Sequence, residues 1–127
     1  MDESVRHALS KSGIVDITTT GRQTGQDRRI EIAYHVVDGK IYISGMPRAD
    51  RQRAWLLNLE ANPKFTFHVK TGVTADLPAT ARVITDETER RAILAHVARA
   101  WNRNDLDVMV SHSPLIEVTV DGLAGAS

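Results

Sequence analysis

The sequence contains no cysteine among its 127 residues. This absence excludes disulfide bonds, thiolate metal sites, iron–sulfur clusters and cysteine nucleophiles. An excess of charge of one sign is missing too, because 16 lysines and arginines balance 16 aspartates and glutamates. A nucleic-acid-binding domain normally carries a basic excess, so we expect no nucleic-acid partner.

Long apolar runs are also absent. No stretch of the chain approaches the roughly 20 apolar residues that a membrane-spanning helix needs. The N-terminal residues MDESVRHALSKSG lack the apolar segment of a signal peptide. We therefore expect a cytoplasmic protein without stable membrane insertion, folded as a single domain over residues 1–127.

The familiar catalytic and metal-binding motifs are missing as well. No HExxH, GxSxG, Walker A or GxGxxG pattern occurs. The histidines show no i, i+2 or i, i+4 pairing, which predicts no metal site; they are His7, His35, His68, His96 and His112.

What is present is a series of short, alternating apolar segments joined by turns. Such period-two patterns are typical of strands, and Asp38-Gly39 is a hairpin signal. The predicted strands are Ile14–Thr20, Arg29–Val37, Lys40–Ser44, Phe65–Lys70, Ala79–Thr85 and Leu115–Val120.

The predicted helices are few. We expect a short one within residues 1–13, one that carries Trp55 and ends at Asn62-Pro63, and one that Asp86 opens. Asn102–Asp107 is predicted to be a polar loop, and residues 122–127 a frayed tail. This order indicates a mainly β protein with flanking helices, an antiparallel six-stranded barrel whose closure removes exposed strand edges.

Two arginine-rich segments are candidates for chemistry. TGRQTGQDRR, residues 20–29, places three arginines around a turn with two glycines, which suits either a phosphate or water. MPRADRQR, residues 46–53, places three more before the helix that carries Trp55. Arginines oppose the dipole at a helix start, so a bound anion would relieve that mismatch, although a solvated charged face explains the pattern equally well.

These segments carry a resemblance. TTTGRQTGQDRR, VVDGKIYIS and WLLNLEANPKFTFHVK are similar to the deazaflavin-dependent nitroreductase family, within the FMN-binding split β-barrel superfamily. The similarity runs from about Ile14 to Val120. It implies a split barrel that binds the deazaflavin coenzyme F-420 and passes a hydride from its reduced form to a quinone, an enone or a nitro compound.

The resemblance also implies site residues. Arg22, Thr24 and Arg28 would hold the coenzyme's phosphate. A donor beside the acceptor would stabilise developing negative charge, and the candidates for it, apart from the resemblance, are Ser44, Tyr34 and backbone amides around Gly45. The remaining candidate coenzyme contacts are Ser44, Gly45, Met46, Pro47, Arg53, Ala54, Trp55 and Asn58.

The sequence departs from the family pattern at two cationic positions. Gln23 and Met46 stand where the family commonly has lysine, and Arg48, Arg51 or Arg53 are the candidate replacements. FMN on the same barrel is therefore an alternative cofactor. A non-catalytic barrel for a hydrophobic ligand is another, with His35 or His68 as candidate haem ligands. The expected partner is a small-molecule acceptor, and the chain is expected to be a monomer or a homodimer.

Overall fold

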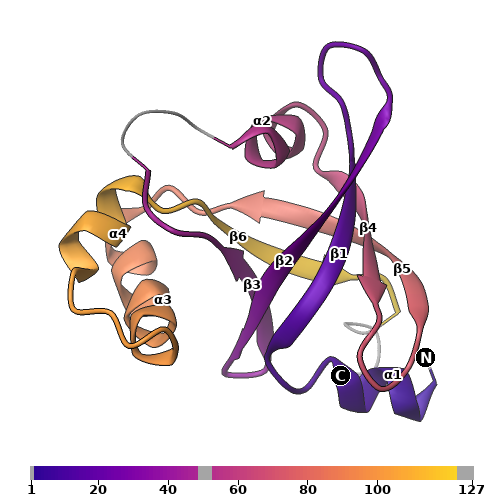
Figure 1. Ribbon diagram of the computed structural model, residues 1–127, viewed down its shortest axis with the longest axis horizontal. Coiled ribbons are helices and arrows are strands. Elements are labelled where there is room, and N and C mark those ends of the chain that lie inside the picture. The colour runs from indigo at the N-terminus through magenta and orange to yellow at the C-terminus, as the bar shows by residue number, and fades with distance from the viewer. Residues whose placement is uncertain (1, 49–52, 123–127) are drawn as a thin grey trace.

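The computed structural model describes residues 2–48 and 53–122, which form a closed, six-stranded antiparallel barrel with flanking helices (Figure 1). The strands follow one another around the barrel in the order β1-β2-β3-β6-β5-β4. The predicted fold class is thereby confirmed. The elements are α1 (Glu3–Ala8), β1 (Gly13–Thr20), β2 (Asp27–Val37), β3 (Lys40–Ser44), α2 (Ala54–Ala61), β4 (Lys64–Val69), β5 (Ala75–Val83), α3 (Glu87–Ala100), α4 (Leu106–His112) and β6 (Leu115–Val120).

Alternation along the strands separates the barrel interior from its outer face. Ile41 and Ile43 of β3 join the interior cluster, whereas Tyr42 between them belongs to a second cluster outside. Helices α1 and α2, which Figure 1 shows at opposite ends of the barrel, add Leu9 and Leu59 to the interior cluster. Burial of such side chains is the main force that holds the barrel together.

The second cluster lies between the outer face of β2 and β3 and the pair α3 and α4. Val37 and Tyr42 pack there with Leu94, Val97 and Met109. Tyr42 therefore covers the outer face of the sheet. Helices α3 and α4 therefore cover the outer face of β2 and β3, while the other face of these strands belongs to the barrel interior.

Arg90 of α3 ties the end of α4 to the barrel. Its guanidinium donates to the backbone oxygens of Ile84 at 2.9 Å, Val110 at 2.9 Å and Ser113 at 2.6 Å. A fourth, longer contact of 3.5 Å reaches the oxygen of Met109. Carbonyls at the end of a helix lack hydrogen-bond donors within the helix, and the Arg90 guanidinium provides donors for those at the end of α4.

The structure corrects the sequence prediction at α4. Asn102–Asp107 was predicted to be a loop, but Leu106–His112 is a helix. Its apolar residues Leu106, Met109 and Val110 have the helical spacing i, i+3, i+4. The segment is only 7 residues long, and packing on α3 stabilises a helix that would be marginal alone.

Strand β5 also begins earlier than predicted, at Ala75 rather than Ala79. In the sequence, the Leu77-Pro78 step indicates a turn, an edge or a bulge, because proline cannot donate to a sheet. The oxygen of Pro78 accepts from Asp121 N at 2.9 Å, just past the end of β6. The Pro78 nitrogen faces the same neighbouring strand as its oxygen. Because β6 has already ended there, no β6 carbonyl lacks a donor when proline has no N–H.

The helix starts follow the sequence signals. Asp86 accepts a hydrogen bond from Glu89 N at 2.9 Å and caps α3 as predicted. Helix α1 spans Glu3–Ala8 within the predicted residues 1–13. Residues 123–127 of the predicted frayed tail, and Arg51 in the second arginine segment, lie outside the described residues. Among the described residues, no helix has the length and apolarity needed to cross a bilayer.

Candidate functional site

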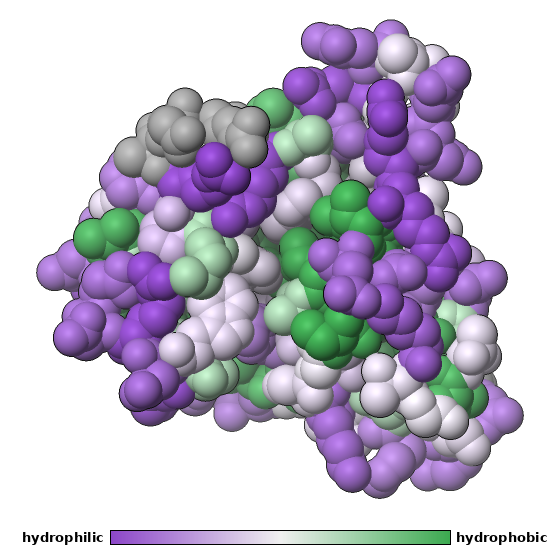
Figure 2. Space-filling view, in the orientation of Figure 1, coloured by the Kyte–Doolittle hydropathy of each residue, from purple (hydrophilic) through white to green (hydrophobic). Residues whose placement is uncertain are grey.

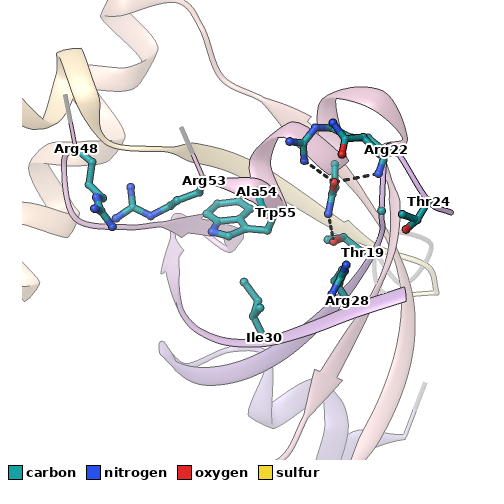
Figure 3. Close-up of a pocket in the computed structure, with 12 residues that line it drawn as sticks. Thr19, Arg22, Thr24, Arg28, Ile30, Arg48, Arg53, Ala54 and Trp55 are labelled. Carbon is teal, nitrogen blue, oxygen red and sulfur yellow. Dashed lines mark hydrogen bonds between the residues drawn. The ribbon is translucent and has the colours of Figure 1, made fainter. Parts of the chain in front are cut away.

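A groove of about 540 Å³ lies between the β1–β2 hairpin and the start of α2 (Figure 3). The hairpin contributes Thr19, Gly21, Arg22, Gln23, Thr24, Arg28 and Ile30 to its walls. The opposite wall consists of Arg48, Arg53, Ala54, Trp55 and Asn58. In Figure 2, apolar residues gather at the centre of this face, beside the polar hairpin tip at the upper right. The groove is within the size range of small-molecule sites.

The hairpin turn is fixed by its own backbone. Gly21 N donates to Gln26 O at 2.7 Å, and Gly25 N donates to Gly21 O at 2.8 Å. A Cβ on Gly21 would lie 2.9 Å from Gln26 O, and Gly25 has a positive φ of 73°. Both positions therefore favour glycine, and the closed turn presents Arg22 and Thr24 on the groove.

Asn58 connects the two walls. Its Oδ1 accepts from Arg22 N at 3.2 Å and from Arg22 Nη1 at 3.1 Å. Its Nδ2 donates to Thr19 Oγ1 at 3.1 Å. Asn58 and Thr19 are both buried, so these bonds form in a poorly solvated region where they orient the guanidinium of Arg22 (Figure 3).

The groove is strongly cationic. Arg22, Arg28, Arg48 and Arg53 line it, and within the described part of the chain no carboxylate does. Figure 3 shows Arg22 and Arg28 toward one end and Arg48 and Arg53 toward the other. Guanidinium groups donate paired hydrogen bonds to phosphate or carboxylate oxygens, so this distribution suits an anionic ligand.

An apolar stretch lies between these charges. Trp55, Ala54 and Ile30 line the middle of the groove (Figure 3). Trp55 is buried and also belongs to the interior cluster of the barrel. Trp55 therefore packs in the core and also lines the groove, where it offers an aromatic surface to a flat ring.

The start of α2 lacks the usual side-chain capping groups. Arg53 is the N-cap residue, it makes no side-chain capping bond, and the first turn contains no acidic residue. The Arg53 guanidinium lies on Gly45, where a Cβ would come within 3.0 Å of its Nε. Gly45 thus leaves room for Arg53 and does not itself line the groove.

The segment 44–47 stands apart from the groove. Ser44 is buried and its hydroxyl donates to Pro114 O at 2.7 Å. Met46 is 50% exposed, and its sulfur receives a contact from Arg103 Nη1 at 3.5 Å. Neither Ser44, Met46 nor Pro47 is among the described residues that line the groove.

Tyr34 is not brought to the groove either. Its hydroxyl donates to Ala8 O at 2.9 Å, and burial raises the pKa of its phenol. Its ring meets Phe67 edge-on at 5.5 Å. Tyr34 lines a different depression, beside α1, so the structure separates this candidate donor from the arginines.

The two candidate haem histidines are also accounted for. His68 Nδ1 bonds Asp76 Oδ1 at 2.7 Å, and its Nε2 bonds Thr18 Oγ1 at 2.6 Å, so both ring nitrogens are engaged. His35 is buried on the outer face of β2, against Trp101 at the end of α3. Neither ring lines the groove.

Of the eleven candidate coenzyme contacts, the groove brings together Arg22, Thr24, Arg28, Arg53, Ala54, Trp55 and Asn58. Sequence reasoning missed Thr19 and Ile30 as lining residues. They lie on either side of the hairpin, where Thr19 pairs with Arg28. Only the register of β1 on β2 would have placed them beside the arginines.

Solved structures with the same fold include proteins that bind flavins or deazaflavins. A conserved hypothetical protein of Mycobacterium tuberculosis is 19% identical with a TM-score of 0.68, over 95% of this chain and 81% of that one. A NimC/NimA family protein of Clostridium acetobutylicum is 15% identical with a TM-score of 0.61, over 94% and 84%. An F-420-H(2)-dependent reductase is 23% identical with a TM-score of 0.55, over 84% and 93%. These likenesses show that the chain shares its fold with these proteins.

The family follows from a second finding. The model of the F-420H(2)-dependent quinone reductases matches residues 2–121. The chain belongs to this family and is an oxidoreductase that uses the deazaflavin coenzyme F-420. The resemblance carried by the GRQTG turn and the block around Trp55 and Asn58 is confirmed.

Proposed function

We propose that the groove holds reduced F-420 beside a small organic acceptor, a quinone, an enone or a nitro compound. The observation that carries this proposal is the set of four arginines around an apolar, aromatic centre, with no described carboxylate in the lining. An anionic coenzyme with a flat ring matches both parts of the groove.

The chain's own residues bind and orient. Arg22, Thr24 and Arg28 hold the phosphate, while Trp55 and Ala54 hold the ring system. Asn58 positions Arg22 rather than contacting the coenzyme itself. Arg48 and Arg53 take the place of the two family lysines that Gln23 and Met46 replace.

The reaction needs little acid–base help from the protein. When bound, the reduced coenzyme supplies a hydride, and water supplies the proton that completes reduction of a quinone to a hydroquinone. The protein's contribution is to hold the acceptor in a fixed position, which makes a bimolecular reaction nearly unimolecular. The absence of a catalytic motif in the sequence is consistent with this mode of action.

Fluorescence titration with F-420 and, in parallel, with FMN tests the proposal. We expect F-420 to bind at micromolar concentrations or tighter, and the Arg28→Gln variant to bind about tenfold more weakly, because one charge-assisted contact is lost. Arg29→Gln is the matched control, since Arg29 points to the other face and pairs with Asp16 at 3.0 Å.

Two results would contradict the proposal. One is folded protein that binds FMN but not F-420. The other is equal weakening by the substitutions at Arg28 and Arg29, because a general loss of positive charge would then explain the change without a site on the groove side of β2.

A further inference from the structure

A second depression, of about 460 Å³, adjoins the groove. Arg48 and Arg53 line both cavities, so the two are neighbours that meet at this pair of arginines. The depression lies between α2, the β5–α3 connection and the end of α4. A hydrogen bond of 3.4 Å from Arg48 N to His112 O joins the arginine segment to α4.

A reductase has to hold two molecules at once. The groove of about 540 Å³ is of a size for one small ligand, and the depression adds a separate space next to it. The depression beside α1 is no substitute, because none of its described lining residues lines the groove. A ligand there could not meet a ring held against Trp55.

The lining of the adjoining depression indicates the chemistry of its ligand. Leu56, Val83 and Leu115 supply apolar surface on one side. Arg48, Arg53 and Arg90 face a single carboxylate among the described lining residues, that of Glu60. The balance of charge is positive, which favours a ligand with an anionic group.

Hydroxyl groups add to this polar side. Thr85, Ser111 and Ser113 line the depression. Ser113 is buried, and its hydroxyl has no hydrogen-bond partner among the described residues. Buried hydroxyls normally have partners, and Arg90 fixes the backbone of Ser113 through its carbonyl oxygen at 2.6 Å. The Ser113 hydroxyl is itself buried, so the hydroxyls that a ligand in the depression can reach are those of Thr85 and Ser111, which are exposed.

We propose that this depression is the acceptor site and that it selects acceptors carrying an anionic oxygen group, such as a carboxylate, beside a flat reducible ring. The inference rests on the proposed function and specifies its substrate class. The ring would lie toward the groove and the carboxylate toward Arg90, Thr85 and Ser111, which line the depression and not the groove.

A matched pair of acceptors tests the selection, a naphthoquinone with an acetic acid arm and its methyl ester. In the full-length protein we expect a higher kcat/KM for the acid. Ser111→Glu adds a negative charge to the wall and is expected to lower the acid-to-ester ratio about threefold. Glu60→Gln removes a negative charge and is expected to raise the ratio about threefold. Val108→Glu adds the same charge to α4 outside the depression and is the control.

Binding without turnover gives an independent measurement. Naphthylacetic acid, which has the carboxylate but no quinone, is expected to compete with the acid acceptor, more weakly in Ser111→Glu and more strongly in Glu60→Gln. Naphthylacetic acid should still bind in the presence of oxidised F-420, because the two ligands occupy different cavities.

The outcomes separate the two proposals. Failure of F-420 to bind overturns the proposed function itself. Binding of F-420 with turnover of both acceptors, and an acid-to-ester ratio that neither substitution changes, overturns only the acceptor site. A Ser111→Glu variant that weakens F-420 instead of naphthylacetic acid also overturns it, because the depression would then hold an anionic part of the coenzyme.

Discussion

Helix α2, at one end of the barrel, and helix α3, on the outer face of β2 and β3, begin in opposite ways. Helix α3 is completed by its own side chains, with Asp86 as cap and acidic residues in the first turn. Helix α2 has an arginine as N-cap, no side-chain capping bond and no acid in its first turn. In α3 the cap accepts a hydrogen bond from a backbone N–H group and stabilises the helix. In α2 the positive N-terminal end has no acidic side chain of its own helix beside it, and an anion would be stabilised there.

The buried polar groups next to these helices differ in the same sense. Asn58 of α2 has partners for both ends of its amide, Arg22 and Thr19. His35, under α3, has a buried Nε2 with no partner among the described residues. The buried amide on α2, at the candidate site, is thus fully hydrogen-bonded. The buried imidazole of His35, under α3, is not, and burial favours its uncharged form.

The largest expected effect follows from Asn58→Ala. Arg22 N and the Thr19 hydroxyl would lose a partner in a buried region, so the free energy of unfolding should fall by about 3 kcal/mol. F-420 binding should weaken as well, because Arg22 loses its orientation. Urea unfolding and fluorescence titration measure the two effects.

Asn58→Asp is the informative control. It keeps an acceptor for Arg22, so most of the stability should return, but it adds a carboxylate to a groove for anions. Recovery of both stability and F-420 affinity would contradict the assignment of the groove to an anionic ligand.

A smaller effect is expected at His35. Burial lowers the pKa of its imidazole below the ordinary value of about 6.5, so the folded state binds fewer protons than the unfolded state. Its contribution to stability is complete above pH 6.5 and decreases as the pH falls through the lowered pKa, by at most about 1.4 kcal/mol per pH unit. The difference in unfolding free energy between the wild type and His35→Phe should therefore change between pH 7 and pH 5, and a constant difference would show that His35 does not titrate there.

The smallest expected effect compares the two helix starts directly. Asp86→Ala should destabilise the protein by about 1 kcal/mol through loss of the α3 cap and leave F-420 binding unchanged. Arg53→Ala should cost less stability than Asp86→Ala, because Arg53 makes no capping bond, and should weaken F-420 binding. Thermal unfolding and titration of both variants distinguish these results, and an equal loss of stability in the two would remove the contrast between the helices.

Much of this architecture was predictable because it depends on local pattern. Alternation gave the strands, Asp38-Gly39 the hairpin, and Asp86 the start of α3. Helix α4 was not predicted because its helical apolar spacing involves few residues and because its stability comes from packing on α3.

The arginine-rich turn was identifiable, but its partner was not. Arg22 and Asn58 are 36 residues apart, and only the packing of α2 across the hairpin brings them together. Ser44 and Tyr34 were predicted as donors from their positions in the chain, yet their hydroxyls are bonded to Pro114 and Ala8. Spacing along a sequence does not reveal which face of a closed barrel a helix will cover.

Arg90 has a consequence for how the molecule is tied together. In a chain without cysteine, one guanidinium links α3, the end of β5 and the close of α4 by donating to the carbonyls of Ile84, Val110 and Ser113. It acts as a non-covalent staple that needs no oxidising compartment. Arg90 and two of its anchor points, Ile84 and Ser113, line the adjoining depression, so a scaffold side chain also fixes part of that cavity's wall.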